Sequence, residues 1–369
     1  MNITFAFPAP SLSGGCRVVA IYAQMLVNAG HHVTIVCPGF KYGGVVTSFK
    51  RLLRGGITTE KRLKNSHFSE LKGVEVQFVS PDRINDSRFY PDADVLVATW
   101  WKTAEWISGF PPSKGKKAYF VQHYEAHQEQ PLERVINTYR ADFPKIVIAE
   151  WIADVMEKKY GDSDTILVPN AVDKNQFFRE PKPEPENRVT VCAMYSRSEF
   201  KGMDITFSAF RKLRKDNEDA KLILFGAKPV APDIDLPQGA EFVLAPSKSE
   251  LRRIYSTSRA YIFSSRSEGF GLPILEALAC GCPVVATKAG CAPSYITDGV
   301  NGYLSDIDDA ESQANGLRSI LALSDSSWSE MSAAAMRSVE NSSWESSYRK
   351  FENALIKISK NNQLVSPVS

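Results

Sequence analysis

The chain has 369 residues, of which 43% are hydrophobic and 23% are charged. This composition fits two ordinary globular domains and excludes a disordered chain. The formal net charge of +2 is too small to predict a nucleic-acid-binding protein or a surface that binds membranes as a whole.

The six cysteines include no Cys-x-x-Cys pair, and no histidine stands beside them at zinc-ligand spacing. Most lie in apolar or small-residue runs, where a reduced thiol packs as a small hydrophobic group. No segment reaches the roughly 20 apolar residues of a membrane span, and the first residues do not resemble a signal peptide. We therefore expect a cytoplasmic protein without a bound metal, at most peripheral at the inner face of the cell membrane.

Short apolar runs alternate with helix-like stretches along the first half of the chain. The first run covers residues 2–7, and a loop-like stretch then leads into a helical pattern that Gly30 ends. Further runs follow at 33–37, 74–79, 95–99, 118–121, 146–149 and 166–168. This alternation predicts a parallel sheet with helices on both faces, in a first domain of residues 1–178.

Residues 178–186 hold three prolines among charged side chains and predict a linker. The pattern then restarts, with apolar runs at 189–194, 222–225, 242–244, 261–263 and 284–286. We expect a second doubly wound domain over residues 187–342. Residues 343–369 are expected to form a helix that packs back on the first domain, followed by a tail. Two such Rossmann-like α/β domains predict a ligand cleft at the carboxyl ends of both sheets.

Two acids, Glu268 and Glu276, lie around the start of a helix expected from residue 272. The glycines between them, Gly269 and Gly271, let the backbone approach a ligand closely, and the N–H groups of a helix start favour an anion. A phosphate flanked by two carboxylates fits this pattern. The simpler alternative is that Glu276 complements the helix dipole and Glu268 is exposed to solvent.

Residues 267–286 closely resemble the E-x7-E motif of the retaining glycosyltransferases of family 4 (glycosyl transferases group 1), which have the GT-B fold. The resemblance implies that the first Glu and the backbone after it hold the sugar of a nucleoside-diphosphate-sugar donor, and that the second Glu binds the nucleotide ribose. The donor-binding residues that it implies here are Glu268, Gly269, Phe270, Gly271, Leu272 and Glu276.

Residues 195–202 resemble the family's Gly-Arg followed by Lys-Gly. The match implies that Arg197 and Lys201 neutralise the leaving diphosphate, a task that a metal ion performs elsewhere. Taken alone, an Arg and a Lys four residues apart more simply form a solvated face. With these matches the resemblance covers nearly the whole chain, from Gly14 to Trp344.

The acceptor side is expected in the first domain. Residues 11–15 resemble the family's Gly-Gly loop, which implies that Gly14 and Gly15 touch the donor phosphates and the acceptor. A tight turn explains this loop about as well. His123 follows the apolar run at 118–121, where the family often has a His near the acceptor. It would orient the acceptor hydroxyl or accept its proton. The alternative is a partly buried, hydrogen-bonded His.

Three further patterns leave alternatives open. Trp100, Trp101 and Trp106 follow a strand end and either line an acceptor groove or pack the core. Residues 49–64 mix cations with leucines and either contact anionic lipid headgroups or form a basic surface loop. Residues 92–94 spell Asp-x-Asp, the metal-binding motif of another glycosyltransferase fold, but they precede an apolar run and are better interpreted as the start of a strand.

The resemblance implies a metal-independent, retaining hexosyltransferase of polysaccharide or cell-envelope biosynthesis. Its acceptor would be a hydroxyl of a glycan, a lipid-linked glycan or a small molecule, and retention follows from the resemblance alone. The alternatives are a GT-B sugar-nucleotide epimerase or phosphorylase, and a non-catalytic sugar-nucleotide-binding protein. The expected catalytic residues are His123, Arg197, Lys201 and Glu268.

Overall fold

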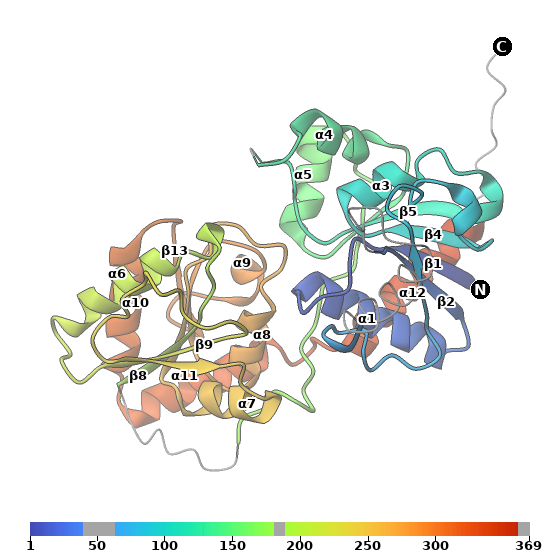
Figure 1. The fold of residues 1–369 in the computed structure, drawn as a ribbon. Helices are drawn as coiled ribbons and strands as arrows, with labels where there is room; N and C mark the ends of the chain where they lie inside the picture. Colours follow the sequence, from blue (N-terminus) through green and yellow to red (C-terminus); the bar gives the residue numbers. More distant parts are fainter. Residues whose placement is uncertain (40–62, 128, 181–188, 361–369) are drawn as a thin grey trace. The chain divides into compact units, whose positions relative to one another are not determined.

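The computed structural model describes residues 1–39, 63–127, 129–180 and 189–360, which form two compact α/β units (Figure 1). The first unit contains Met1–Pro169 and the chain from Glu345 onward, and the second contains Asn170–Trp344. Each unit is built around one parallel sheet with helices packed on it. The predicted pair of Rossmann-like doubly wound domains is therefore confirmed.

The described part of the first unit has a seven-stranded parallel sheet in the order β3-β2-β1-β4-β5-β6-β7. Its strands are β1 Asn2–Ala6, β2 His32–Pro38, β3 Glu75–Val79, β4 Val95–Ala98, β5 Lys116–Val121, β6 Lys145–Val147 and β7 Ile166–Leu167. The strand order reverses between β1 and β4, so ligand-binding loops are expected at the carboxyl ends of these strands.

The helices of the first unit are α1 Gly14–Asn28, α3 Trp101–Ile107, α4 Leu132–Arg140 and α5 Glu150–Tyr160, with the short 3-10 turns η1 Ser87–Phe89 and η2 Pro112–Lys114. The last helix, α12 Trp344–Lys360, also packs on this unit. Its Phe351 stacks on Tyr22 of α1 at 4.4 Å and meets Phe120 of β5 edge-on at 5.1 Å. His31 Nε2 lies 2.9 Å from Glu352 Oε1, so α12 is also tied to the residue before β2.

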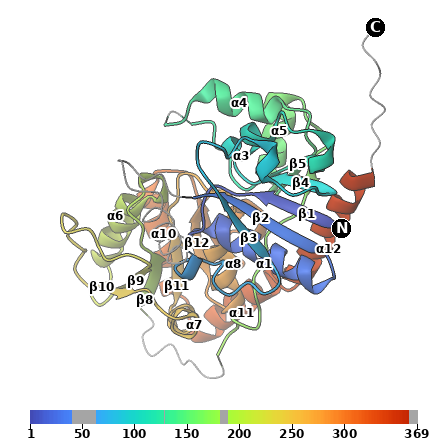
Figure 2. The same ribbon diagram turned by 45° about the vertical axis from the view of Figure 1, so that its right-hand side comes forward.

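The described residues of the second unit form a six-stranded parallel sheet in the order β10-β9-β8-β11-β12-β13, labelled in part in Figure 2. The strands are β8 Thr190–Met194, β9 Lys221–Gly226, β10 Ala240–Leu244, β11 Ala260–Phe263, β12 Val284–Thr287 and β13 Gly302–Ser305. Here the strand order reverses between β8 and β11. The sequence patterns predicted five of these strands and missed β13.

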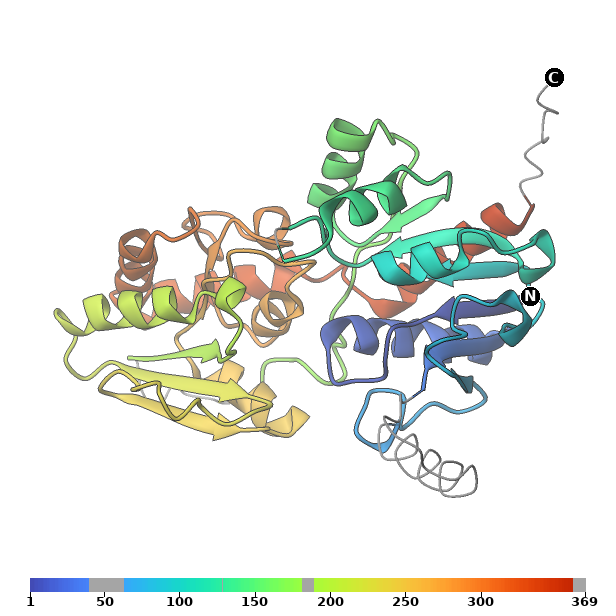
Figure 3. The ribbon, with the colours of Figure 1, turned by 45° about the horizontal axis from the view of Figure 1, so that its top comes forward.

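The helices of the second unit are α6 Met203–Arg214, α7 Lys248–Thr257, α8 Leu272–Ala279, α9 Ala292–Tyr295, α10 Ala310–Leu321 and α11 Asp325–Ser338, with the 3-10 turn η3 Glu199–Lys201. Helix α6 packs beside α10 and lies along the sheet in Figure 3. Phe207 and Phe210 of α6 and Leu317 of α10 share one buried core with the strands. Helix α8 packs against α7 and α11.

The expected boundary between the domains was placed too late in the chain. Residues 170–180 belong to the second unit rather than to the first. Phe177 meets the ring of Tyr255 edge-on at 6.3 Å, and the Arg179 guanidinium lies 5.4 Å from the centre of the Trp328 ring. These contacts hold the segment on the second unit. Most of the predicted linker, from residue 181 onward, lies outside the described residues.

All six cysteines lie in the described part of the chain, and all are free and buried. Burial raises the pKa of the Cys16, Cys280, Cys282 and Cys291 thiols. Of the described helices, none has both the length and the apolar character needed to cross a membrane. Residues 49–62 of the predicted membrane-contact segment lie outside the described residues, so that contact stays a prediction.

Replacing Phe351 by Ala should destabilise the first unit, because the ring is fully buried between α1 and β5. Removing a buried phenyl ring costs about 3–5 kcal/mol. The free energy of unfolding, measured by denaturant titration, should fall by that amount. Leu12→Ala is the matched control, since Leu12 is 63% exposed in the same unit and its loss should change the free energy by less than about 0.5 kcal/mol. Equal effects of the two substitutions would contradict this role of α12.

Candidate functional site

The carboxyl ends of β8 and β11, where the second sheet reverses its strand order, carry the predicted donor-binding residues. Strand β8 leads into η3, which ends at Lys201, and β11 leads into the loop that holds Glu268. Lys201 Nζ lies 2.5 Å from Glu268 Oε1, and the Ser265 hydroxyl donates to the same oxygen at 2.8 Å. The structure therefore joins two predicted site residues that are 67 positions apart in the sequence.

Glu268 is only 9% exposed, so the alternative of a solvent-exposed carboxylate is wrong. The lysine side chain is 22% exposed, which leaves its ammonium group within reach of solvent. The attraction between the two charges and the additional hydrogen bond compensate for the cost of removing the charges from water. Removing either partner would leave the other charge without its main counterion.

Gly202 fixes the position of Lys201. It adopts the left-handed conformation with φ 62°, and a Cβ built on it would lie 2.0 Å from the backbone oxygen of Ser264. Only glycine therefore lets the end of η3 approach the end of β11 this closely. Phe200 adds a backbone contact, because its carbonyl oxygen accepts from the Arg266 N–H at 2.7 Å.

Arg266 holds η3 and the start of α6 together. Its guanidinium donates to Asp204 at 2.6 and 3.0 Å, to Asp308 at 2.6 Å and to the Glu199 carbonyl at 2.7 Å. The hydrogen bonds to Asp204 are the main cause of the raised pKa of Arg266, and they lower the pKa of Asp204 in turn. The turn that presents Lys201 is thus fixed from two sides.

A buried hydrogen-bond chain stiffens the end of β11. Thr206 Oγ1 donates to Ser264 Oγ at 2.8 Å, and Ser264 Oγ donates to Gln313 Oε1 at 2.7 Å. Gln313 Nε2 then donates to the Phe263 carbonyl at 3.1 Å. Because every member is buried and partnered, this chain favours one conformation of the strand end.

The glycine-rich loop before α8 has a defined shape. Gly271 is the N-cap of α8 with φ 96°, and Pro273 occupies an early helix position where its missing N–H is tolerated. A Cβ on Gly290 would lie 2.3 Å from the Phe270 carbonyl, which instead accepts from the Cys291 N–H at 2.6 Å. The loop after β12 therefore supports residues 268–271, with the first N–H groups of α8 directly beyond them.

Glu276 is 5% exposed within α8, and the Tyr255 hydroxyl lies 3.5 Å from its Oε2. Arg197 has a different partner from Lys201, because its Nη2 donates to the Pro229 carbonyl at 2.9 Å. Lys201 and Glu268 are thus brought together directly, whereas Arg197 is directed to the loop after β9. Ser265 and Gly290 were not predicted from the sequence, although they lie two and three residues after the ends of β11 and β12, where site residues in such folds often lie.

The predicted residues of the first unit lie at the carboxyl ends of β1 and β5. Gly14 begins α1, whose N-cap Ser13 accepts from the Cys16 N–H at 3.3 Å. A Cβ at Gly14 would meet no atom within 4 Å, and one at Gly15 would make ordinary contacts with Gln122. Neither glycine has a positive φ. Packing within the unit therefore does not explain why these positions are glycine.

His123 is the second residue after the end of β5. Its Nδ1 lies 2.8 Å from the Tyr124 carbonyl oxygen, and its ring meets Trp151 edge-on at 6.5 Å. A carbonyl can only accept, so Nδ1 carries a hydrogen, and Nε2 is the basic nitrogen of the neutral ring. This tautomer suits a group that accepts a proton from a hydroxyl. His123 could therefore keep its hydrogen bond to the Tyr124 carbonyl and still accept a proton through Nε2.

Residues 92–94 form the connection that leads into β4, which begins at Val95. Asp94 Oδ2 accepts from the Asn2 N–H at 2.7 Å, and Asp92 pairs with Lys114 at 2.8 Å, directly before β4. Among the residues that the structure describes, no group of three or more His, Cys, Asp or Glu side chains is arranged to hold a metal ion.

Glu125 lies at the same strand end, and the pKa of its carboxyl is strongly raised. Burial raises the pKa of its carboxyl to about 8, although the Trp101 N–H, at 3.1 Å, and the Tyr119 hydroxyl, at 3.4 Å, act to lower it. The Tyr139 hydroxyl accepts from the Glu125 N–H at 2.9 Å. At neutral pH the carboxyl is therefore mostly protonated, beside His123 on the same loop.

The raised pKa of Glu125 predicts a pH-dependent stability. The contribution of Glu125 to the free energy of unfolding should be fully present below the ordinary carboxyl pKa near 4.5. It should be lost as the pH rises through about 8. Glu125→Gln keeps the shape of the side chain but cannot titrate. Between pH 5 and pH 9 the free energy of unfolding of this variant should therefore fall less than that of the wild type, by a few kcal/mol. Denaturant titrations at both pH values test this. Parallel profiles for the variant and the wild type would contradict the assignment.

Comparison with known proteins matches residues 174–337 to the model of the family described as glycosyl transferases group 1. Among curated relatives, a D-inositol 3-phosphate glycosyltransferase of Thermobifida fusca is 38% identical over 100 residues, which cover 27% of this chain and 23% of the relative. O-antigen chain mannosyltransferase B of Escherichia coli is 34% identical over 106 residues, covering 28% and 27% of the two chains. The matched stretches thus span about a quarter of these relatives.

Similar solved structures extend over almost the whole chain. Sucrose-phosphate synthase of Thermosynechococcus elongatus has a TM-score of 0.71 at 17% identity, with 97% of this chain and 99% of that chain covered. Anabaena HepE in complex with UDP and glucose has a TM-score of 0.74 at 17% identity, with 97% and 100% covered. At such identities the likeness shows the fold, which is GT-B. Residues 174–337 thus match the model of the glycosyl transferases group 1 family, within a chain that has the GT-B fold.

Proposed function

We propose that this protein transfers a glycosyl unit from a nucleoside-diphosphate sugar to a hydroxyl acceptor. The observation that carries the proposal is the Lys201–Glu268 pair beside the glycine-rich loop, at the strand-order reversal of a glycosyl transferases group 1 domain. A cation, a carboxylate and a helix N-terminus are the groups needed to hold a diphosphate and a sugar next to each other.

In this proposal the N–H groups at the start of α8 and the ammonium of Lys201 bind the donor diphosphate. They stabilise the negative charge that develops as the sugar–oxygen bond breaks. Glu268 accepts hydrogen bonds from hydroxyls of the donor sugar, and Glu276 accepts them from the ribose. Arg197 would add a second cation after leaving the Pro229 carbonyl, a change that needs only rotation of an exposed side chain.

Acceptor activation is assigned to the first unit. Nε2 of His123 would accept the proton of the attacking hydroxyl, because Nδ1 is held as a donor by the Tyr124 carbonyl. Gly14 and Gly15 would admit the donor phosphates or the acceptor to the start of α1, since no packing contact requires glycine there. HepE has been solved with UDP-glucose, which supports a nucleotide sugar as the donor class.

Lys201→Ala should reduce turnover by at least about 100-fold, because removing one preorganised charged donor costs about 3 kcal/mol of transition-state stabilisation. The assay measures acceptor-stimulated release of the free nucleoside diphosphate from a panel of sugar nucleotides. Lys212→Ala is the matched control, since Lys212 forms an exposed ion pair with Glu311 at 2.7 Å in the same unit. The control should retain full activity.

Three outcomes would contradict the assignment. Full activity in both Lys201→Ala and Glu268→Ala would remove these residues from the reaction. Consumption of the donor without any effect of an acceptor would favour an epimerase or a phosphorylase. Binding of a sugar nucleotide without turnover for any acceptor would favour a non-catalytic binding protein.

We further propose that the reaction retains the anomeric configuration and needs no metal ion. Retention is supported by the family resemblance alone. Because no carboxylate of the site is assigned as a covalent nucleophile, retention would require the acceptor to attack from the face that the diphosphate leaves. In the presence of EDTA, an α-linked donor should give an α-linked product, with its anomeric proton identified by NMR spectroscopy. A β-linked product, or turnover that requires added Mg²⁺ or Mn²⁺, would contradict this proposal.

A further inference from the structure

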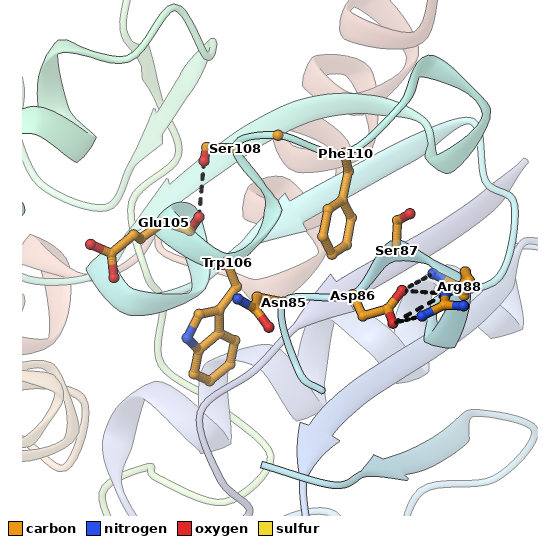
Figure 4. Close-up of a pocket in the computed structure, with 9 residues that line it drawn as sticks. Asn85, Asp86, Ser87, Arg88, Glu105, Trp106, Ser108 and Phe110 are labelled. Atoms are coloured by element: carbon orange, nitrogen blue, oxygen red, sulfur yellow. Dashed lines mark hydrogen bonds and ion pairs between the residues drawn. The ribbon is translucent and has the colours of Figure 1, made fainter. Parts of the chain in front are cut away.

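An open hollow of about 520 Å³ lies on the first unit, between residues 85–88 and residues 105–110 (Figure 4). This volume is within the range of roughly 300–1,000 Å³ that small-molecule sites occupy. The proposed function uses none of the residues that line it. It is therefore a candidate for a second site.

The hollow is separate from the carboxyl edge of the first sheet. Helix α3 starts at Trp101, just after the carboxyl end of β4, and the hollow is lined by the far end of this helix, around Trp106. Seven helical residues span about 10 Å at roughly 1.5 Å per residue. A ligand in the hollow would thus lie about two helix turns from the strand ends that carry His123.

The tryptophans of this region have different roles. Trp101 is completely buried and belongs to the core, whereas Trp106 is half-buried and lines the hollow. Phe110 also lines the hollow and is 6% exposed, with its ring edge-on to Tyr90 at 4.8 Å. A half-buried indole offers a flat apolar surface with a polar N–H at its edge. The C–H face of a pyranose ring matches such a surface.

Neutral polar groups also line the hollow. The Asn85 side chain is exposed and offers both an amide donor and an amide acceptor, and Ser87 adds a hydroxyl. The Ser108 hydroxyl donates to the Glu105 carbonyl at 2.9 Å, which leaves its oxygen able to accept. Sugar hydroxyls both donate and accept, so they fit this mixed set.

The charged groups at the hollow are already paired. Arg88 donates to both carboxylate oxygens of Asp86, at 3.0 Å from Nε and 2.7 Å from Nη2, and these bonds lower the pKa of Asp86 to about 2. Glu105 is paired with Arg134, whose Nε lies 2.8 Å from Oε1. These two ion pairs carry no net charge, and in each pair the arginine already donates to the carboxylate. An uncharged ligand is therefore favoured over a nucleotide or a sugar phosphate.

The wall that carries Asn85 is held in place before any ligand arrives. The Tyr90 hydroxyl donates to the Ile84 carbonyl at 2.8 Å, and Lys114 Nζ donates to the Tyr90 carbonyl at 2.8 Å. Gln77 of β3 donates to the Phe89 carbonyl at 3.1 Å. Because this wall is already ordered, binding would cost less conformational entropy.

We infer that this hollow binds an uncharged sugar unit of a glycan, stacked on Trp106 and hydrogen-bonded by Asn85. The inference goes beyond the proposed function, since it adds a carbohydrate site that takes no part in the transfer. A chain that is held here by one sugar unit would stay bound to the protein while another part of it reacts.

Saturation-transfer NMR with five neutral disaccharides tests the site directly: maltose, cellobiose, mannobiose, lactose and diacetylchitobiose. At least one should give a saturable signal with the wild-type chain at millimolar concentration. Its affinity should fall about tenfold or more in Trp106→Ala, and less in Trp106→Phe, which keeps an aromatic face. Asn85→Ala, at an exposed position, should weaken binding without affecting the fold.

Phe178→Ala is the matched control, because Phe178 is a 39% exposed aromatic residue of the second unit. Its binding signal should equal that of the wild type. The inference is overturned if no disaccharide binds, if Trp106→Ala and Asn85→Ala both bind as well as the wild type, or if UDP displaces the sugar. Lys201→Ala should bind the disaccharide normally, so failure of the proposed transfer and failure of this site are distinguishable.

Discussion

The ion pair between Lys201 and Glu268 is the contact on which the geometry of the candidate site depends. It joins η3 to the loop after β11 at 2.5 Å, and it forms only because Gly202 lets the two backbones approach each other closely. The neighbouring bonds of Arg266 and Ser265 fix the same two segments. A partly buried pair of this kind is stable in the absence of a ligand, yet an incoming diphosphate offers the lysine a stronger negative charge.

Much of the fold follows from the sequence, because short apolar runs that alternate with helical patterns leave few topologies other than two doubly wound sheets. Strand β13 was not predicted, because its place depends on a tertiary contact that sequence patterns do not show. It has only two large apolar side chains, and its place is set by Gly302, where a Cβ would lie 2.0 Å from the Val284 carbonyl. That close approach is a tertiary contact. The domain boundary was misplaced for the same reason, since Phe177 and Arg179 find their partners about 80 and 150 residues further along the chain.

The site was predictable in part. The resemblance identified Lys201, Glu268 and the glycines between Glu268 and α8, and the structure adds the hydroxyl of Ser265 and the supporting turn at Gly290. Local sequence gave no indication that Arg197 would bond to the Pro229 carbonyl or that burial would raise the pKa of Glu125. Both depend on which segments pack together in three dimensions. At the carboxyl end of β5, burial keeps Glu125 mostly protonated at neutral pH, so this side chain adds little negative charge beside His123.

A crystal structure of the protein with a bound nucleoside diphosphate would test the role of the Lys201–Glu268 pair directly. We expect terminal phosphate oxygens within about 3 Å of the first backbone N–H groups of α8 and of Lys201 Nζ, with the lysine moved away from Glu268. A nucleotide bound elsewhere, with the Lys201–Glu268 pair unchanged beside an empty glycine-rich loop, would contradict it.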